Sequence, residues 1–420
     1  MNAVAKGVEL AVGTPLNVKA WSAAPSDGTK ALLDQYALEI EQEMIAFRRD
    51  LHQHPEASNQ EFRTTRKVAE RLEKAGLRPR LMPNSTGLFC DIPGLEPGAP
   101  MTAFRADLDA LPVQDEKAVP YRSTVPGFSH ACGHDVHTAG VLGAGLVLAR
   151  LATANALPAP VRLVFQPAEE KIAGALYMID KGVLDGVFRI LALHCDPKID
   201  VGQVGLKEGP LTSACDLVKL TVRAGEGVMD AAPPNVVNAV SALVTGVPSA
   251  VSQQVPTGSG ISIVWGHVTA NALTDGGDER AAGDGFLQCT IRCIDERAWE
   301  LAEPLFRNAV DSICALYGVV PELEYTRGIP PVVNEAMSID LFRRATEEVL
   351  GKPGVTSTEQ SLGGEDFAWF VRERAGAMAR LGVRSPGVER TLDLHQGLFD
   401  VDERAIGVAT RLLATAALLR

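Results

Sequence analysis

Three histidines, a cysteine and an aspartate fall within the eight residues from His130 to His137. Cys132 and His134 are two positions apart, and residues at that spacing do not share a helix face, so we expect an extended or looped backbone there. The cluster lies between a turn, Pro126-Gly127, and a small-residue apolar run, 139–149. Thiolate and imidazole are ligands for Zn²⁺ and its neighbours in the divalent series, so the cluster predicts part of a metal site.

Further candidate ligands follow short apolar runs that have the pattern of buried strands. Two glutamates come after the run 160–166, and a histidine comes directly after the run 189–193. In parallel sheets, ligand sites gather at the carboxyl ends of strands. Of two adjacent glutamates, one can bind metal while the other accepts a proton from an activated water. The full candidate set is Cys132, His134, Glu169, Glu170, His194 and His395, with Asp107 and Asp109 nearby in the expected sheet.

Helical and strand patterns alternate around these residues. We expect helices at 30–51, 64–75, 139–149 and 173–181, and strands at 87–92, 101–106, 160–166 and 189–193. The same pattern returns as a helix at 336–350, a strand at 377–383 and a helix at 403–419. This alternation predicts an α/β fold with a mostly parallel sheet flanked by helices.

A different order of elements interrupts that pattern. Strands at 216–223, 259–268, 285–293 and 319–326, with helices at 235–251 and 296–317, give the order β-α-β-β-α-β of a ferredoxin-like α+β unit. We therefore expect a metal-binding catalytic domain formed by 29–215 plus 326–420, an inserted domain at 216–325, and a leader at 1–28.

Composition and charge limit the classes of partner. The chain has 420 residues, enough for two domains, and a formal net charge of -12, which disfavours nucleic acid and anionic membranes. Its seven cysteines are an odd number without a C-x-x-C pair, unlike a secreted disulfide framework. No signal-peptide pattern is recognised, and the apolar run 139–149 is typical of a buried helix. We expect a cytoplasmic protein that acts on a small molecule.

Six motifs stand in the order of a known family. They are Arg-Arg-Asp-Leu-His-Gln-His-Pro-Glu at 48–56, Arg-Ala-Asp-Leu-Asp-Ala-Leu-Pro at 105–112, the cluster at 130–137, Phe-Gln-Pro-Ala-Glu-Glu at 165–170, Gly-Glu-Asp-Phe at 364–367 and Leu-His at 394–395. On these motifs, the chain from about Phe47 onward resembles the M20 metallopeptidases, and within them the amidohydrolase branch that includes hydrolases of hippurate and of indoleacetyl-amino acids.

The resemblance implies roles for the candidate set. It implies that one or two divalent metal ions are bound by Cys132, His134, Glu170, His194 and His395. Glu169 is then the general base and later the general acid. Mn²⁺ is the preferred ion and Zn²⁺ or Ni²⁺ are alternatives, because this mixed ligand set does not select among them. The resemblance also makes 216–325 a lid and dimerisation domain, so we expect a homo-oligomer, at least a dimer.

The lid departs from the family pattern. Where the family has Gly-His-Ala-Ala-x-Pro-His, the chain has Val-Met-Asp-Ala-Ala-Pro-Pro-Asn at 228–235, so the histidine that reaches a substrate oxyanion is missing. An expected arginine clamp for a substrate carboxylate is replaced by Gln253 and Gln254. Asn271 fits the family's lid asparagine. We expect Met229 and Asn271 to face the substrate.

Losing an oxyanion donor costs an acyl-transfer enzyme about 3–4 kcal/mol of transition-state stabilisation. Either another group replaces the histidine, or the reaction avoids a localised oxyanion. We expect a metal-dependent hydrolase that cleaves a C–N bond in a small aromatic or N-acyl compound. One version deaminates an activated aromatic amine such as 5-nitroanthranilate, the substrate of an outlying family member, and the alternative is an ordinary N-acyl-amino acid amidohydrolase. Readings of other classes are a non-catalytic, metal-dependent binding protein and a structural zinc site.

Overall fold

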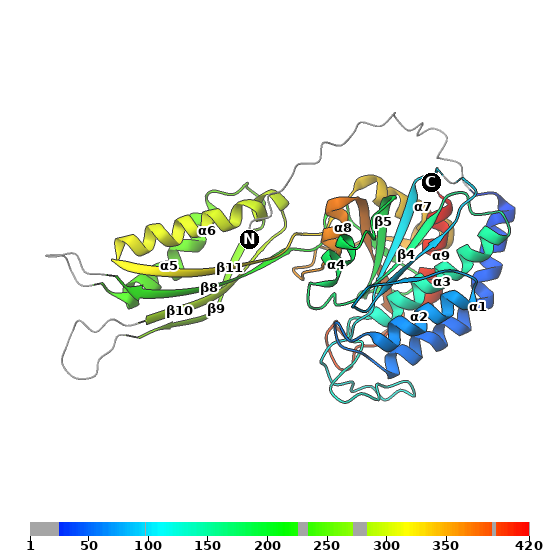
Figure 1. Cartoon of the computed structure of the whole chain (residues 1–420), viewed down its shortest axis with the longest axis horizontal. Coiled ribbons are helices and arrows are strands. Elements are labelled where there is room, and N and C mark those ends of the chain that lie inside the picture. The colour runs from blue at the N-terminus through cyan, green and yellow to red at the C-terminus, as the bar shows by residue number, and fades with distance from the viewer. Residues whose placement is uncertain (1–24, 97, 226–233, 272–283, 389–391, 420) are drawn as a thin grey trace.

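Two sheets organise the computed structural model of the chain (Figure 1). The structure describes residues 25–96, 98–225, 234–271, 284–388 and 392–419. One sheet has eight strands, and the other has four. The segment in which the sequence predicts a different order of elements forms the four-stranded sheet, and the segments on either side of it form the eight-stranded sheet.

The eight-stranded sheet has the strand order β1-β2-β4-β3-β5-β14-β6-β13. Its centre, from β4 through β3 and β5 to β14, is parallel. The strands are β1 (Arg80–Leu81), β2 (Leu88–Ile92), β3 (Met101–Asp107), β4 (Val161–Gln166), β5 (Val187–Asp200), β6 (Val204–Leu206), β13 (Val355–Ser357) and β14 (Ala375–Arg384). The central strands are buried almost throughout because helices cover both faces, as expected for a parallel sheet.

The helices divide unequally between the two faces of this sheet (Figure 1). One face carries α1 (Asp27–Gln53), α2 (Phe62–Lys74), α3 (His134–Thr153), α7 (Ala336–Leu350) and α9 (Arg404–Leu418). The other face packs against α4 (Gly174–Asp180) and α8 (Phe367–Glu373). A short 3₁₀ turn, η2 (Lys352–Gly354), precedes β13. The α/β fold class predicted from the sequence is confirmed.

Helix α3 lies deep in this core because its small residues allow close packing. A Cβ added at Gly143 would lie 2.4 Å from Thr410 Oγ1 on α9, and one at Gly145 would lie 2.2 Å from Leu163 Cδ1 on β4. In the described part of the chain, α3 is the one helix whose length and composition would suit a membrane span, and 78% of that window is buried inside the protein. Burial of this kind is typical of a core helix.

The four-stranded sheet is antiparallel, with the order β11-β8-β10-β9. Its elements are β8 (Ala214–Ala224), α5 (Val236–Ser252), β9 (Ser262–Ala270), β10 (Asp284–Cys293), α6 (Glu296–Leu316) and β11 (Val319–Ile329). Both helices pack on one face, where alternate residues of β8 and β10 are buried. Asn235 and Asp295 cap the two helices through their side-chain oxygens. This is the ferredoxin-like unit that the sequence predicted.

The chain passes between the two sheets twice, and the two passages are hydrogen-bonded to each other. They pair as a small antiparallel ladder of β7 (Gly209–Pro210) with β12 (Val333–Asn334). The unit built on the four-stranded sheet is thus attached through two adjacent connections, as expected for an insertion.

One expected strand end is wrong. We expected a strand at 189–193 that stops before His194, but β5 continues to Asp200. Its pairing with β3 ends at Ala192, whereas its pairing with β14 continues to Asp200. The backbone of β5 therefore stays extended beyond the point where β3 leaves it, and His194 lies inside the strand at that opening.

Candidate metal centre

A left-handed turn places Cys132 and His134 next to each other. His134 is the first residue of α3, and Gly133 before it has φ 88°. This conformation favours glycine, and a Cβ at Gly133 would also lie 2.8 Å from Cys195 Sγ. Cys132 thus stands in a looped segment, as the two-residue spacing predicted.

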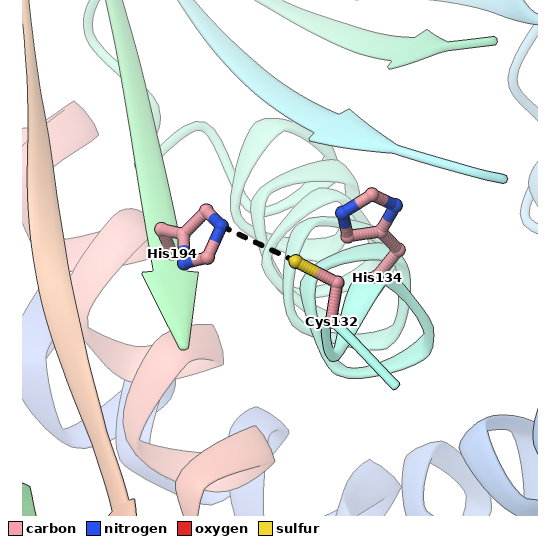
Figure 2. A group of neighbouring side chains, drawn as sticks. All are labelled: Cys132, His134 and His194. Atoms are coloured by element: carbon pink, nitrogen blue, oxygen red, sulfur yellow. Dashed lines mark hydrogen bonds between the residues drawn. The ribbon is translucent and has the colours of Figure 1, made fainter. Parts of the chain in front are cut away.

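Cys132 and His194 face each other across the end of the sheet (Figure 2). Cys132 Sγ lies 3.6 Å from His194 Nε2, and both residues are buried. His194 Nδ1 donates to the Cys195 carbonyl oxygen at 2.8 Å, which leaves Nε2 directed at the sulfur. A thiolate and an imidazole that share one tetrahedral ion would be separated by about 3.6 Å, given bond lengths near 2.3 and 2.1 Å.

Two buried atoms in this group have no hydrogen-bond partner in the part of the chain that the structure describes. They are His134 Nε2 and Glu170 Oε1, which lie 3.8 Å apart. Glu170 Oε1 is also 3.7 Å from His395 Nε2, and His134 Nε2 is 3.9 Å from Glu169 Oε2. A buried polar atom without a hydrogen-bond partner is destabilising by about 1–3 kcal/mol, and a bound ligand that contacts these atoms would offset that cost. The structure therefore brings together all six candidates of the sequence analysis.

The two glutamates are positioned by Asp109. Its Oδ1 accepts from the backbone N–H of Glu169 at 3.1 Å, and its Oδ2 accepts from the N–H of Glu170 at 3.0 Å. The Asp109 carbonyl oxygen accepts from His134 Nδ1 at 2.8 Å. Ala168, which precedes the pair, has φ 53° and donates its N–H to Glu61. One aspartate thus orients three candidate residues.

Glu169 lies among other carboxylates. It is buried and forms a close group with Glu365 and Asp366. Burial raises the pKa of Glu169 well above its ordinary value, and the negative charges of Glu365, Glu170 and Asp366 raise it further. Arg105 binds Glu365 at 3.0 Å and Asp366 at 3.1 Å, so this acidic group is partly balanced. Glu365 has no role among the sequence predictions, although it lies in the recognised Gly-Glu-Asp-Phe motif.

Two other members of the 130–137 cluster, His137 and Asp135, have partners for their nitrogens and oxygens, whereas both ring nitrogens of the buried His130 have no hydrogen-bond partner among the described residues. His137 Nδ1 lies 2.6 Å from Asp107 Oδ1, and His137 Nε2 accepts from the Cys195 N–H at 2.8 Å. Asp135 pairs with Arg48 and His52, each at 2.7 Å. These contacts fix the positions of His137 and Asp135 next to the candidate ligands. Asp107 Oδ2 lies 3.7 Å from His134 Nε2, so Asp107 is a neighbour of the site, as the expected order of the sheet predicted.

A cavity of about 600 Å³ opens beside the candidate ligands. Its walls include Cys132, Glu169 and His395, together with residues 356–361, 363 and 364 from the end of β13 and the loop after it. Of the two expected substrate contacts, Asn271 lies exposed after β9 and is not among the lining residues, and Met229 lies outside the described residues.

The donor set fits a divalent metal centre. Thiolate, imidazole and carboxylate donors converge within the range expected for neighbouring ligands, and two of the donor atoms have no hydrogen-bond partner among the described residues. The six residues exceed the four ligands of a closed structural zinc site. The arrangement can hold one or two ions and still leave a carboxylate beside them.

Comparison with known proteins gives the same result. The family model described as peptidase family M20/M25/M40 matches residues 103–418. An N-acetyl-L-cysteine deacetylase of Bacillus subtilis strain 168 is 35% identical over 385 residues, 90% of this chain and 88% of that protein. A Rhodococcus jostii RHA1 protein, provisionally named glutamate–cysteine ligase 2-3, is 43% identical over 382 residues, which cover 89% of this chain. The chain spans about half, 46%, of the length of that relative.

A solved structure extends the match to three dimensions. The crystal structure of the Bacillus subtilis YxeP protein, described as a dinuclear metal-binding peptidase from the M20 family, has a TM-score of 0.79 and 30% sequence identity. The match covers 90% of this chain and 98% of that one. By its sequence match, its fold and its donor set, this chain belongs to peptidase family M20/M25/M40.

Proposed function

We propose that the chain is a metal-dependent amidohydrolase that removes the acyl group from a small N-acyl amino acid, and that N-acylated cysteine is the first substrate to test. The observation that carries this proposal is the pair of partnerless buried atoms, His134 Nε2 and Glu170 Oε1, beside Glu169. Members of the family hydrolyse C–N bonds of amides or peptides. What we add to the family's reaction is the identity of the substrate, meaning its acyl group and the amine to which that group is bound.

The proposed ligand set uses residues from four parts of the fold. One or two divalent ions, with Mn²⁺ preferred over Zn²⁺ or Ni²⁺, would be held by Cys132, His134, Glu170, His194 and His395. A bound divalent ion supplies Lewis acidity, which polarises an amide carbonyl and makes water acidic enough to ionise near neutral pH.

Glu169 would carry the proton between the two halves of the reaction. Its carboxylate accepts a proton from the attacking water, whose oxygen becomes bonded to the carbonyl carbon. The C–N bond then breaks, and the protonated Glu169 delivers that proton to the departing amine. The products are a carboxylic acid and an amine, and the acid gives up its remaining proton to leave a carboxylate and a protonated amine. Burial and the neighbouring carboxylates raise the pKa of Glu169, which makes its carboxylate a stronger base than that of an exposed glutamate.

The relatives favour acyl hydrolysis over aromatic deamination. Two Bacillus subtilis relatives are named as deacetylases of N-acetylcysteine, and the second is 34% identical over 90% of this chain and 96% of that protein. None of the reported comparisons favours hydrolysis of 5-nitroanthranilate. Deamination is therefore kept as one outcome of the test, since the segment that contains Met229 lies outside the described residues.

The test begins with removal and return of metal. Dialysis against a chelator should abolish turnover of N-acetyl-L-cysteine, and Mn²⁺, Zn²⁺ or Ni²⁺ should be compared for its return. Glu169→Gln should keep its metal content, measured by mass spectrometry, yet lower kcat by about 10²–10⁴-fold, the usual contribution of a general base. Glu359→Gln, which changes an exposed carboxylate on the cavity wall, is the matched control and should keep its activity.

The products decide between the two reactions. Free amino acid released from N-acyl amino acids supports the proposal, whereas ammonia released only from activated anilines assigns deamination. A metal-loaded Glu169→Gln protein with normal turnover would contradict the role of Glu169. Thermal stabilisation by N-acetyl-L-cysteine without any product, under every metal tested, would favour a binding protein.

We also propose that the chain forms a dimer in the cytoplasm, with a catalytic domain at 29–215 plus 326–420 and a lid and dimerisation domain at 216–325. The seven cysteines are free in the structure, which supports a reducing compartment. Strand β9 supports the dimer, because it lies at the edge of its sheet and exposes Val264 and Val268.

A further inference from the structure

A buried arginine stands beside the proposed metal ligands without a carboxylate partner. Arg380 lies on β14 and is 7% exposed. It is in register with His194 on the neighbouring parallel strand β5, so both side chains stand on the same face of the sheet. Arg380 also lines the cavity. Its charge is therefore directed to the same space as the candidate metal centre.

The contacts of the Arg380 guanidinium leave most of its donors unused. Its Nη2 donates to Ser361 Oγ at 3.2 Å, and among the described residues no carboxylate oxygen lies within 4.0 Å of its nitrogens. The acidic neighbours Asp196 and Glu365 already accept other donors, from Lys198 N at 2.9 Å and from Arg105 at 3.0 Å. The guanidinium thus has free N–H groups on the cavity side.

An arginine in this position needs an anion. The guanidinium cannot shed its proton in a protein, and a buried charge without a counterion is costly. The fold makes room for this side chain, because a Cβ at the facing Gly205 would lie 3.2 Å from Arg380 Cβ. Arg162, another buried arginine, has the usual arrangement, with Asp91 at 2.6 Å. Arg380 has no such carboxylate among the described residues, and unlike Arg189, which also lacks one, it lines the cavity, so an anion in the cavity can reach it.

The charges on the cavity wall narrow the kind of anion. Arg380 and the exposed Lys198 are the two basic residues among the lining residues, and the acidic ones are Glu169, Glu170, Asp196, Glu359, Glu365 and Asp393. An anion inside the cavity would therefore be drawn to the Arg380 side. A carboxylate matches the planar guanidinium best, because two parallel N–H···O bonds can form.

We propose that Arg380 binds a carboxylate of the substrate and so selects anionic N-acyl compounds. This assignment rests on the proposed amidohydrolase function. The carboxylate can belong either to the amine half of the substrate, as in an N-acyl amino acid, or to the acyl half, as in an N-succinyl amine. Both present the same group to Arg380, and the experiment separates them.

The test uses two matched pairs of substrates with the metal-loaded full chain. N-Acetyl-L-cysteine and its carboxamide differ in a carboxylate on the amine half, and N-succinylcysteamine and N-propionylcysteamine differ in one on the acyl half. We expect kcat/KM to favour the anionic member of one pair by about 10- to 100-fold, the value of a hydrogen-bonded charge pair. Arg380→Met should remove that preference, mainly through a higher KM.

Two further variants separate recognition from folding. Arg380→Lys should keep part of the preference, and guanidinium ion added at millimolar concentration should restore part of it to Arg380→Ala. A purely structural role would not respond to the added ion. Arg189→Met is the matched control, because Arg189 is buried to a similar extent, at 8% exposed, on the neighbouring strand β5 but does not line the cavity. It should leave the preference between paired substrates unchanged.

Each result decides the proposal. If Arg380→Met lowers kcat equally for both members of each pair, or leaves their ratio unchanged, the carboxylate role is wrong while the proposed hydrolase function stands. If the unaltered enzyme turns over none of the four compounds, the proposed function is wrong for these substrates. The role of Arg380 is then tested separately by calorimetry, which measures binding without turnover. Binding of an anionic compound to Glu169→Gln protein that disappears with Arg380→Met supports the anion site, and binding unaffected by Arg380→Met overturns it.

Discussion

Asp109 shows how one side chain sets the geometry of others at this site. Both of its carboxylate oxygens accept backbone N–H groups, one from Glu169 and one from Glu170. Oδ2 also accepts from the Ser58 hydroxyl at 2.7 Å. Because the two N–H groups belong to successive residues, the carboxylate fixes the direction of that backbone. The positions of the proposed base and of one proposed ligand thus depend on a residue that binds neither substrate nor metal.

We predict that Asp109→Asn lowers kcat/KM or metal affinity by about 10- to 100-fold, the usual effect of a residue that orients metal ligands. The asparagine keeps the size but presents an N–H₂ group to one of the two backbone N–H groups. Metal titration and steady-state kinetics measure the effect. Ser58→Ala removes one hydrogen bond and keeps the carboxylate, so it should cause a smaller loss. Equal behaviour of Asp109→Asn and the unaltered protein would contradict this role.

Residue types and local spacing identified the proposed ligands but not their surroundings. Cys132, His134 and the glutamate pair could be recognised because adjacent or near-adjacent polar residues interrupt apolar segments. Arg380 could not, because its importance comes from the register of β14 against β5, which places it beside His194. A single arginine in a strand pattern gives no sign of whether its counterion is present.

Among the elements, α1 and α2 are joined by a small ion network. Arg63 on α2 donates to both oxygens of Asp50 on α1, at 2.8 and 2.9 Å, and Lys67 lies 3.3 Å away. Partial burial raises the pKa of Asp50, but the hydrogen bond and charge of Arg63, together with Lys67, outweigh it and hold the pKa below its ordinary value. The ionised form therefore stabilises the packing of the two helices.

We predict that Asp50→Asn lowers stability at pH 7 by about 1 kcal/mol or less, because the three side chains are partly exposed and screened. Since the folded-state pKa is lowered, this contribution is present above the unfolded-state pKa of about 3.9 and disappears as the pH falls through the folded-state value. Urea denaturation at pH 7 and near pH 3 measures the difference. Glu70→Gln, on the exposed side of α2, is the control. A difference that grows on acidification would contradict the prediction.

The elements themselves were predictable where apolar periodicity was long. The helices α1, α3 and α6 and the order of the ferredoxin-like unit follow from such patterns. The sequence predicts a strand that is shorter than β5. Residues 194–200 include a histidine, an aspartate, a proline and a lysine, which is not the pattern of a buried strand. Pairing with β14 keeps them extended, and that long-range contact has no local signal.

At the scale of the whole molecule, the two edges of the four-stranded sheet differ. The outer strand β9 reads Ser-Ile-Val-Trp-Gly-His-Val-Thr-Ala, with no proline and no acidic or basic residue other than its histidine. The opposite outer strand, β11, contains Pro321 and three charged residues, Glu322, Glu324 and Arg327. Proline and charge protect a strand edge from pairing with another chain, so β9 is the edge that a second copy can extend.

We predict that Val264→Lys on β9 converts the proposed dimer to a monomer, because it places a charge where the second copy would pack. Val264 is 54% exposed, and Val320 on β11 is 58% exposed. Val320→Lys is therefore a matched control that should leave the dimer intact. Sedimentation equilibrium measures both proteins. Dissociation by the β11 variant alone would assign the interface to the other edge, and a monomeric unaltered protein would contradict the proposal.

The cavity has a consequence for how this chain can change over time. Its lining residues fall within 132–212 and 356–395, and none is a described residue of the segment 216–325. Substitutions in that segment can accumulate without rebuilding the walls that hold the candidate ligands. Sequence change within 216–325 can therefore proceed without a change at the proposed metal ligands or at the described walls of the cavity.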